Sequence, residues 1–255
     1  MRKLAASLIA FSLLASTHAQ SMSQQSLIEH YPPDRTSKRI PVETCQNSHP
    51  SASQTLLTCS RVRVVHTHQD VSNYDESPDI QLELPRGITL TVKMDHLPYF
   101  VGNAYQTDLN GDNRTDLMLT LPWGALGLGG ERAVVVFAVS SGDSYQLSAM
   151  DSFSFGPAAL IRKNNQNFVL HSAFVNTTGK DGKDHSFFVY SHLKIENGKL
   201  QLDAQQSRVW IQYTFRPNGA LTSLLTPQQK TTGWNNYLKW TTEDGMQQGI
   251  FRKVQ

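Results

Sequence analysis

Residues 117–147 read LMLTLPWGALGLGGERAVVVFAVSSGDSYQL and contain three short apolar segments separated by turn residues. Residues 117–121 and 133–139 are rich in leucine, valine and phenylalanine, which suit a buried pleated surface. The turn at residues 141–144 (SGDS) leads directly into residues 145–147, as expected for a tight hairpin. This stretch therefore predicts an antiparallel meander of three strands.

The same pattern continues along the chain. Apolar and polar residues alternate with period two in residues 56–65, 80–84, 88–94, 187–190 and 209–215. Turn signals separate these segments, for example Pro85-Arg86-Gly87 and Glu196-Asn197-Gly198-Lys199. No window shows a 3.6-residue apolar period over three turns, and residues 240–242 also read as a strand. We therefore expect an all-β fold of antiparallel hairpin meanders.

A faint internal repeat suggests how the meanders are arranged. Residues 168–200 can be laid over residues 117–147 at an offset of about 51 residues, within the range of β-propeller blades. The sequence is thus compatible with a β-propeller-like domain. The alternative is that any two antiparallel meanders look alike.

The N-terminal residues indicate export. Arg2 and Lys3 precede an apolar run, residues 4–14, and small residues follow it, which is the pattern of a signal peptide over residues 1–19. Residues 20–55 are polar and turn-rich and read as a loose arm, and residues 56–255 are expected to form the domain. The expected location is periplasmic or secreted, with no membrane span.

Charge and cysteine content limit the function classes. Loss of Arg2 and Lys3 leaves 21 basic against 21 acidic residues, so a nucleic-acid surface is not indicated. Cys45 and Cys59 are the two cysteines, and in an exported protein they predict a disulfide worth roughly 3 kcal/mol in the chain-entropy model. Two free thiols are the alternative.

One loop carries chemistry. Asp108, Asn110, Asp112 and Asp116 place oxygen side chains at positions 1, 3, 5 and 9, and Arg114 offers its backbone carbonyl. Calcium takes six to eight oxygen ligands from a flexible shell, and three carboxylates this close would repel one another without a cation. Gly111 and Asn113 stand where the loop needs left-handed conformations. These residues predict one calcium ion; a turn rich in Asp and Asn without metal is the alternative.

The pattern differs from an EF-hand, because position 12 is Leu119 and a strand follows the loop. Asp-x-Asn-Gly-Asp-x-x-x-Asp-Leu running into a strand resembles the FG-GAP/VCBS repeat, the calcium loop of integrin-type β-propellers. The resemblance covers residues 98–156 and, weakly, 157–200, with Asn113 where that family has glycine. The second repeat lacks carboxylates at residues 163–167, so one calcium site is expected.

Other motifs are weaker. His66, His68 and Asp70 resemble part of the run that binds metal in metallo-β-lactamase-type hydrolases, but the last histidine is missing. The glycine-rich residues 124–130 lack the Lys-Ser/Thr of a phosphate-binding loop, and no helix start follows them. They read instead as a loop that offers Trp123 and Leu126 for contact with a partner.

Three functional hypotheses follow. The first is a calcium-stabilised binding protein, not an enzyme, which resembles small exported immunity proteins that block lysozyme-like peptidoglycan hydrolases. In that reading the blocking loop is residues 122–132 or 176–185. The second is a carbohydrate or surface adhesion module that uses exposed tryptophans, namely Trp123, Trp210, Trp234 and Trp240. The third is a metal-dependent hydrolase that uses His66, His68 and Asp70.

Overall fold

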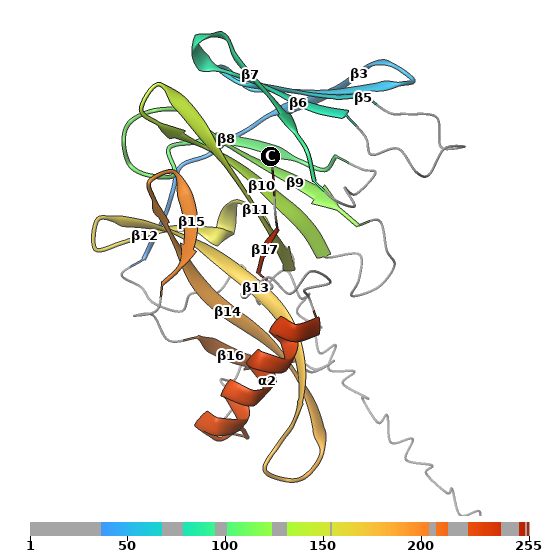
Figure 1. Cartoon of the computed structure of the whole chain (residues 1–255), viewed down its shortest axis with the longest axis vertical. Coiled ribbons are helices and arrows are strands. Elements are labelled where there is room, and N and C mark those ends of the chain that lie inside the picture. The colour runs from blue at the N-terminus through green and yellow to red at the C-terminus, as the bar shows by residue number, and fades with distance from the viewer. Residues whose placement is uncertain are drawn as a thin grey trace, which may run out of the picture.

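The structure is a computed structural model that describes residues 37–67, 79–94, 101–123, 132–153, 155–203, 208–213, 224–240, 250–252 and 254. These residues form three antiparallel sheets, stacked in layers, and one α-helix (Figure 1). We name the sheets upper, middle and lower by their position in Figure 1. The predicted all-β class is confirmed. The described strands follow open paths and do not close into a propeller ring.

Each sheet has its own strand order. The upper sheet runs β3 (Gln46–Ser51), β4 (Gln54–Thr58), β5 (Arg63–Thr67), β6 (Asp79–Leu84), β7 (Ile88–Val92), with the 3-10 turn Pro85–Gly87 before β7. The middle sheet runs β17 (Phe251–Arg252), β11 (Ser144–Phe153), β10 (Arg132–Ser141), β9 (Asp116–Pro122), β8 (Ala104–Thr107), β2 (Glu43–Thr44). The lower sheet runs β1 (Lys38–Arg39), β12 (Leu160–Lys163), β13 (Gln166–Thr178), β14 (Asp184–Glu196), β15 (Lys199–Leu202), with β16 (Val209–Gln212) also on β14 and the 3-10 turn Pro157–Ala159 before β12.

Both predicted meanders are present. Strands β9, β10 and β11 pair in sequence in the middle sheet, and β13, β14 and β15 do so in the lower sheet. Their tight turns lie against each other: a Cβ added to Gly198 would stand 2.9 Å from Cγ of Gln146 and 3.2 Å from Cβ of Ser141. Gly198 also has φ of 76°, so only glycine fits this contact without strain. The two meanders therefore pack side by side.

Strand β10 lies between two apolar cores. Val135, Phe137 and Val139 belong to the cluster between the middle and lower sheets. Val134 and Val136 alternate with them and belong to the cluster shared with the upper sheet. All five are at most 1% exposed. The apolar run of residues 133–139 therefore reflects burial on both faces, as in the central strand of a layered fold.

The helix α2 (Pro227–Trp240) corrects the expectation that the chain has no helix and that a strand begins at Trp240. Thr226 and Gln229 form a reciprocal cap: the Gln229 N–H donates to Thr226 Oγ1 at 3.2 Å, and the Thr226 N–H donates to Gln229 Oε1 at 2.9 Å. Pro227 takes the first helical position, which suits proline. The apolar period is hard to see because the helix is polar apart from the side that carries Trp234 and Tyr237. No helix among the described residues meets the length and hydropathy needed to cross a membrane.

The segment expected to be a loose arm is paired from Lys38 onward. Strand β1 pairs with β12 of the lower sheet, β2 with β8 of the middle sheet, and β3 with β4 of the upper sheet. The prediction failed because these short edge strands expose their side chains and are held by backbone hydrogen bonds. Residues 1–36, which include the expected signal peptide, lie outside the described residues.

The predicted disulfide is confirmed. Cys45 and Cys59 are bonded, with their Cα atoms 4.3 Å apart. The bond joins the residue between β2 and β3 to the turn between β4 and β5, and it contributes to the apolar cluster of the upper and middle sheets. It therefore fixes the N-terminal segment where it passes from one sheet to the next.

One buried titratable group lies in the other core. His171 on β13 is fully buried, and its ring meets that of Trp234 edge to face with centroids 6.4 Å apart. Burial lowers the pKa of His171 from 6.5 to about 4, because the charged imidazolium would lose its hydration.

The pKa of His171 predicts how stability depends on pH. The folded state resists protonation that the unfolded state accepts, so stability is fully present above pH 6.5 and is lost as pH falls toward about 4. The shift corresponds to roughly 3 kcal/mol. Between pH 7 and pH 4.5 we expect the free energy of unfolding, measured with urea, to fall less in His171→Leu than in the wild type. An equal loss in the variant and the wild type would contradict the assignment to His171.

Candidate functional site

The predicted calcium loop connects β8 to β9 in the middle sheet. The antiparallel ladder ends at the pair Thr107–Asp116, and residues 108–115 form the loop. Gly111 has φ of 80° and Asn113 has φ of 60°. Both residues therefore adopt the left-handed conformation that the sequence predicts for them. The local backbone therefore follows the sequence prediction.

Asp108 closes the loop from its first position. Its Oδ1 accepts hydrogen bonds from the N–H groups of Gly111 at 2.7 Å and Asp112 at 3.1 Å. Its Oδ2 accepts from the N–H of Asn113 at 3.0 Å. The Asp108 carboxylate is thus surrounded by backbone donors.

Asp112 and Asp116 meet at Ser140, near the end of β10. Asp116 is fully buried and accepts from the N–H groups of Leu109 and Ser140, both at 2.7 Å. The Ser140 hydroxyl donates to Asp112 Oδ2 at 2.9 Å. Burial raises the pKa of Asp116 to about 6, since those hydrogen bonds only partly replace hydration, and the charge of Asp112 adds to the increase.

Asn110 and Arg114 complete the loop. The Asn110 amide donates to Asp112 Oδ2 at 3.1 Å and to the Ser140 carbonyl at 3.0 Å, and its Oδ1 accepts from the Asp112 N–H at 3.1 Å. The Arg114 N–H donates to Asp112 Oδ1 at 2.9 Å, and its guanidinium donates to the Gly142 carbonyl.

The fit of this loop to a calcium ion can be judged from its donors. Its side chains form hydrogen bonds within the loop and to β10, and no group of three His, Cys, Asp or Glu residues is gathered at a metal-binding distance in the described part of the chain. The donor set consists of hard oxygens, which calcium prefers. Asp116 has no ion pair among the described residues, and the nearest cationic contact in the loop is Arg114 Nε at 3.9 Å from Asp112 Oδ2. The loop therefore offers the oxygen donors and the negative charge that a cation requires, while its carboxylates are not gathered around one point among the described residues.

Among the residues that contact the loop, two that bind its aspartates were not predicted from the sequence. One is Ser140, and the other is Asn167 on β13, whose amide donates to the Asp108 carbonyl at 3.2 Å. Arg162 holds Asn167 by donating to its Oδ1 at 2.7 Å. Both come from strands distant in sequence, and nothing in the linear pattern marks such a contact.

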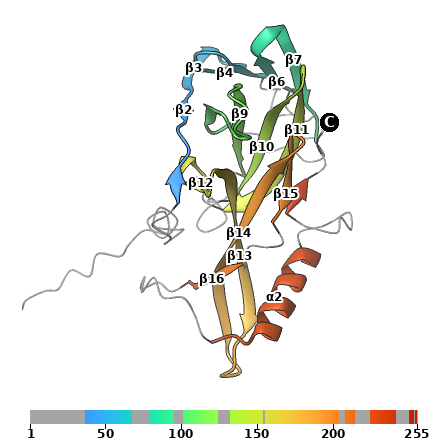
Figure 2. The same ribbon diagram turned by 90° about the vertical axis from the view of Figure 1, so that its left-hand side faces the viewer.

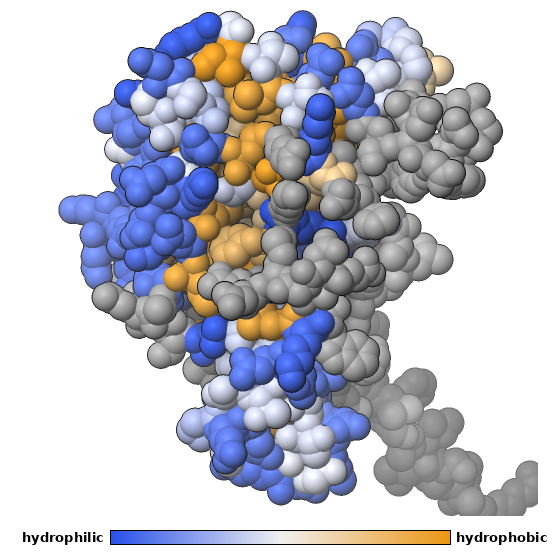
Figure 3. Space-filling model, viewed as in Figure 1, coloured by the Kyte–Doolittle hydropathy of each residue, from blue (hydrophilic) through white to orange (hydrophobic). Residues whose placement is uncertain are grey.

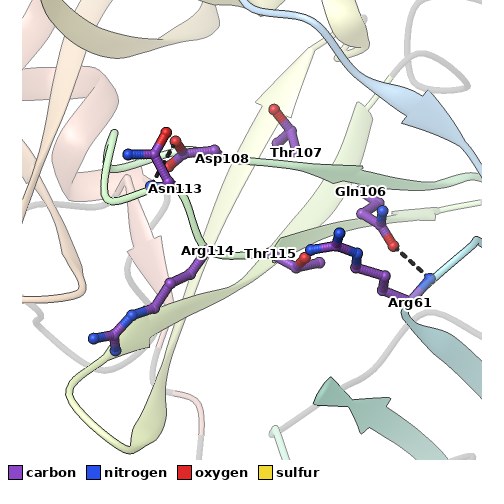
Figure 4. A pocket seen from close by; sticks show the side chains of 7 residues that line it. All are labelled: Arg61, Gln106, Thr107, Asp108, Asn113, Arg114 and Thr115. Carbon is purple, nitrogen blue, oxygen red and sulfur yellow. Dashed lines mark hydrogen bonds between the residues drawn. The ribbon is translucent and has the colours of Figure 1, made fainter. Parts of the chain in front are cut away.

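A shallow polar cavity of about 300 Å³, open to solvent, adjoins the loop (Figure 4). Its lining residues come from the turn between β4 and β5, the end of β8 and the loop itself: Arg61, Gln106, Thr107, Asp108, Asn113, Arg114 and Thr115. The cavity thus lies where the upper and middle sheets meet.

Trp123, expected to be a contact residue, is half-buried and packs against the core of the upper and middle sheets. Its Nε1 donates to Asp151 Oδ1 at 3.4 Å. The guanidinium groups of Arg132 and Arg252 lie 5.4 and 5.1 Å from the centroid of its ring, and both pair with Asp151. Leu126 lies outside the described residues.

The second candidate loop is the end of the β13–β14 hairpin, which projects beyond the sheets with α2 beside it (Figures 1 and 2). His185 Nε2 lies 2.9 Å from Asp181 Oδ1 and lowers the pKa of that carboxyl. Thr178 donates to Asp184 at 3.0 Å, and the Lys180 N–H donates to the Leu224 carbonyl at 3.1 Å. These contacts tie the hairpin end to its own strands and to residue 224, and the lower part of the molecule presents mainly hydrophilic residues in the view of Figure 3.

Three of the remaining candidates are described, and all three are buried. Trp210 and Trp234 are 4% and 2% exposed and belong to the core, so the expectation that they form a sugar platform is wrong. Nothing is described of the side chain of Trp240. His66 is 1% exposed on β5, and His68 and Asp70 lie outside the described residues.

The chain was compared with models of protein families, with curated proteins and with solved structures, and it matches none of them.

The position of Trp123 gives a prediction about stability. We expect Trp123→Ala to lower the free energy of unfolding by roughly 2 kcal/mol, less than a fully buried aromatic residue because the ring is half-exposed. Trp123→Phe keeps most of the packing and should cost less. Denaturant unfolding checks this; an unchanged stability in Trp123→Ala would show that the ring serves only as a surface residue.

Proposed function

We propose that this protein is an exported binding protein that is stabilised by one calcium ion and that blocks a lysozyme-like peptidoglycan hydrolase. The main support is the β13–β14 hairpin, which projects from the body and is held by its own contacts (Figure 2). A preorganised protrusion suits insertion into a cleft, because little conformational entropy is lost on binding. The Cys45–Cys59 disulfide is compatible with an oxidising compartment.

The calcium part of the proposal rests on the loop. Asp108, Asn110, Asp112 and Asp116, with the carbonyl of Arg114, would hold the ion. Bound calcium would supply positive charge beside a buried carboxylate that has no cationic partner among the described residues. We assign the ion a structural role.

The inhibitory part rests on two lysines at the hairpin end, Lys180 and Lys183, which lie beside an equal number of aspartates. Asp181 and Asp184 contact His185 and Thr178 within the hairpin. No partner is found among the described residues for the ammonium groups of Lys180 and Lys183. Most glycoside hydrolases place two carboxyl groups at the bond they cleave. Lysine ammonium groups carried on a narrow hairpin would complement such a cleft.

The hairpin is the better supported of the two candidate loops, because Trp123 has structural contacts. The adhesion hypothesis loses two of its four expected aromatic contacts with the burial of Trp210 and Trp234. The hydrolase hypothesis is weakened by the burial of His66.

We expect calorimetric titration of chelator-treated protein to show one calcium ion per chain. Asp112→Asn should remove most of the calcium-induced rise in melting temperature. In EGTA it should lower the melting temperature by less than that rise, since the amide keeps the shape of the side chain but cannot accept from every donor around Asp112. A ligand that binds only the folded state at a concentration 100 times its Kd stabilises it by about 2.7 kcal/mol. Absence of binding at millimolar calcium, or a stoichiometry of two, would refute the site.

We expect the wild-type protein to suppress lysis of purified peptidoglycan by at least one enzyme in a panel of lysozyme-type muramidases. The double variant Lys180→Ala/Lys183→Ala should raise the inhibitory concentration at least about tenfold, because one charged hydrogen bond contributes about 1.5–3 kcal/mol. Its melting temperature should stay unchanged, as these side chains are exposed.

The matched control replaces two exposed lysines elsewhere, Lys38→Ala/Lys199→Ala, and should inhibit like the wild type. Equal inhibition by the hairpin variant and this control would remove the hairpin from the interface. Failure of the wild type against the whole panel would remove the inhibitor function.

A further inference from the structure

The cavity beside the loop has one cationic group directed into it. Figure 4 shows the Arg61 side chain extending from the turn between β4 and β5 along the cavity toward Thr115, whereas Arg114 points away. Arg114 is occupied by the Gly142 carbonyl. Among the described residues, no ion pair and no side-chain hydrogen bond is found for Arg61, whose backbone N–H is bound by Gln106.

Glu43 forms no ion pair with Arg61 among the described residues. Glu43 accepts from the Ser60 N–H at 2.7 Å, from the Ser60 hydroxyl at 2.6 Å and from the Gln106 amide at 3.0 Å. The Asp108 carboxylate faces the N–H groups of its own loop. The Arg61 guanidinium therefore keeps its donors for another group.

The turn that carries Arg61 is fixed in place. Cys59 at its start is tied to Cys45 by the disulfide, and the Cys59 N–H donates to the Val62 carbonyl at 2.9 Å. Gln106 on β8 contacts both Ser60 and the N–H of Arg61. A guanidinium on a preorganised turn loses less entropy when it binds a ligand than one on a flexible loop.

The opposite wall offers neutral polar groups. Thr115 presents a hydroxyl, and Asn113 presents an amide for which no hydrogen bond is found in the described part of the chain. The Thr107 hydroxyl donates to the Pro41 carbonyl at 2.7 Å and can still accept a hydrogen bond. The cavity thus combines one guanidinium with several hydroxyl and amide groups, and its volume of about 300 Å³ is at the small end of ligand sites.

We propose that this cavity binds an acidic monosaccharide, with the sugar carboxylate on Arg61 and the sugar hydroxyl groups on Asn113, Thr115 and Thr107. Guanidinium pairs with carboxylate through two parallel hydrogen bonds, which favours this group over a neutral one. The amide and hydroxyl side chains both donate and accept, as a sugar hydroxyl requires. This site is independent of the β13–β14 hairpin and of the inhibitor function.

The test is an NMR titration of the full chain with D-glucuronate, with D-glucose as the neutral counterpart of matched shape. We expect saturable shifts at residues lining the cavity with D-glucuronate in the millimolar range and none with D-glucose. Arg61→Gln should weaken D-glucuronate binding at least about tenfold, from the loss of a charged hydrogen-bond pair. Asn113→Gly should weaken it less, and glycine tolerates the backbone φ of 60°.

The matched control is Arg63→Gln, two residues along the chain, where the guanidinium pairs with Glu83 and does not line the cavity. It should bind D-glucuronate like the wild type. The proposal is overturned if D-glucuronate produces no saturable shifts, if D-glucose binds equally well, or if Arg61→Gln binds like the wild type. The hairpin variant Lys180→Ala/Lys183→Ala should bind D-glucuronate like the wild type. A negative result in the inhibition assay therefore does not change the interpretation of this titration.

Discussion

Burial of β10 on both faces is the constraint on which the other layers depend. Its odd-numbered residues from Val135 to Val139 pack toward the lower sheet, and its even-numbered residues pack toward the upper sheet. A strand buried in this way cannot form without both neighbours, because either layer alone would leave one apolar face in water. The three sheets are therefore expected to fold as one cooperative unit, with the meander β9–β10–β11 as the common wall of two cores.

The N-terminal segment reinforces this arrangement by a different interaction. Its strands β1, β2 and β3 each join another sheet, so a single extended segment crosses all three layers. Its strand residues are exposed, and it is held by backbone hydrogen bonds, by Ile40 in the cluster between the middle and lower sheets and by the Cys45–Cys59 disulfide. The covalent bond lies where the segment leaves the middle sheet for the upper one. The same turn of Cys59 positions Arg61, so the connection between sheets also shapes the cavity.

The features that were predicted correctly from the sequence are those that short segments of the chain determine. The alternation in residues 117–147, the disulfide and the left-handed positions of Gly111 and Asn113 could all be read from short segments. The helix α2 was not predicted because its apolar period is weak. Its N-terminus is marked in the sequence only by the capping residues Thr226 and Gln229. The edge strands β1, β2 and β3 were not predicted because they are paired through their backbones, and such pairing does not require an alternation of apolar and polar side chains. Contacts such as Ser140 with Asp116 depend on strand register across 24 residues, which no local pattern encodes.

The loop and the core are linked through that last contact. Ser140 lies on β10, and its N–H and hydroxyl bind Asp116 and Asp112. The charge of the buried Asp116 is therefore attached directly to the strand that both cores share. Whatever neutralises this charge stabilises the central strand as well as the loop, because a ligand that binds only the folded state shifts the whole folding equilibrium. A cation at this loop would consequently act on the stability of all three layers.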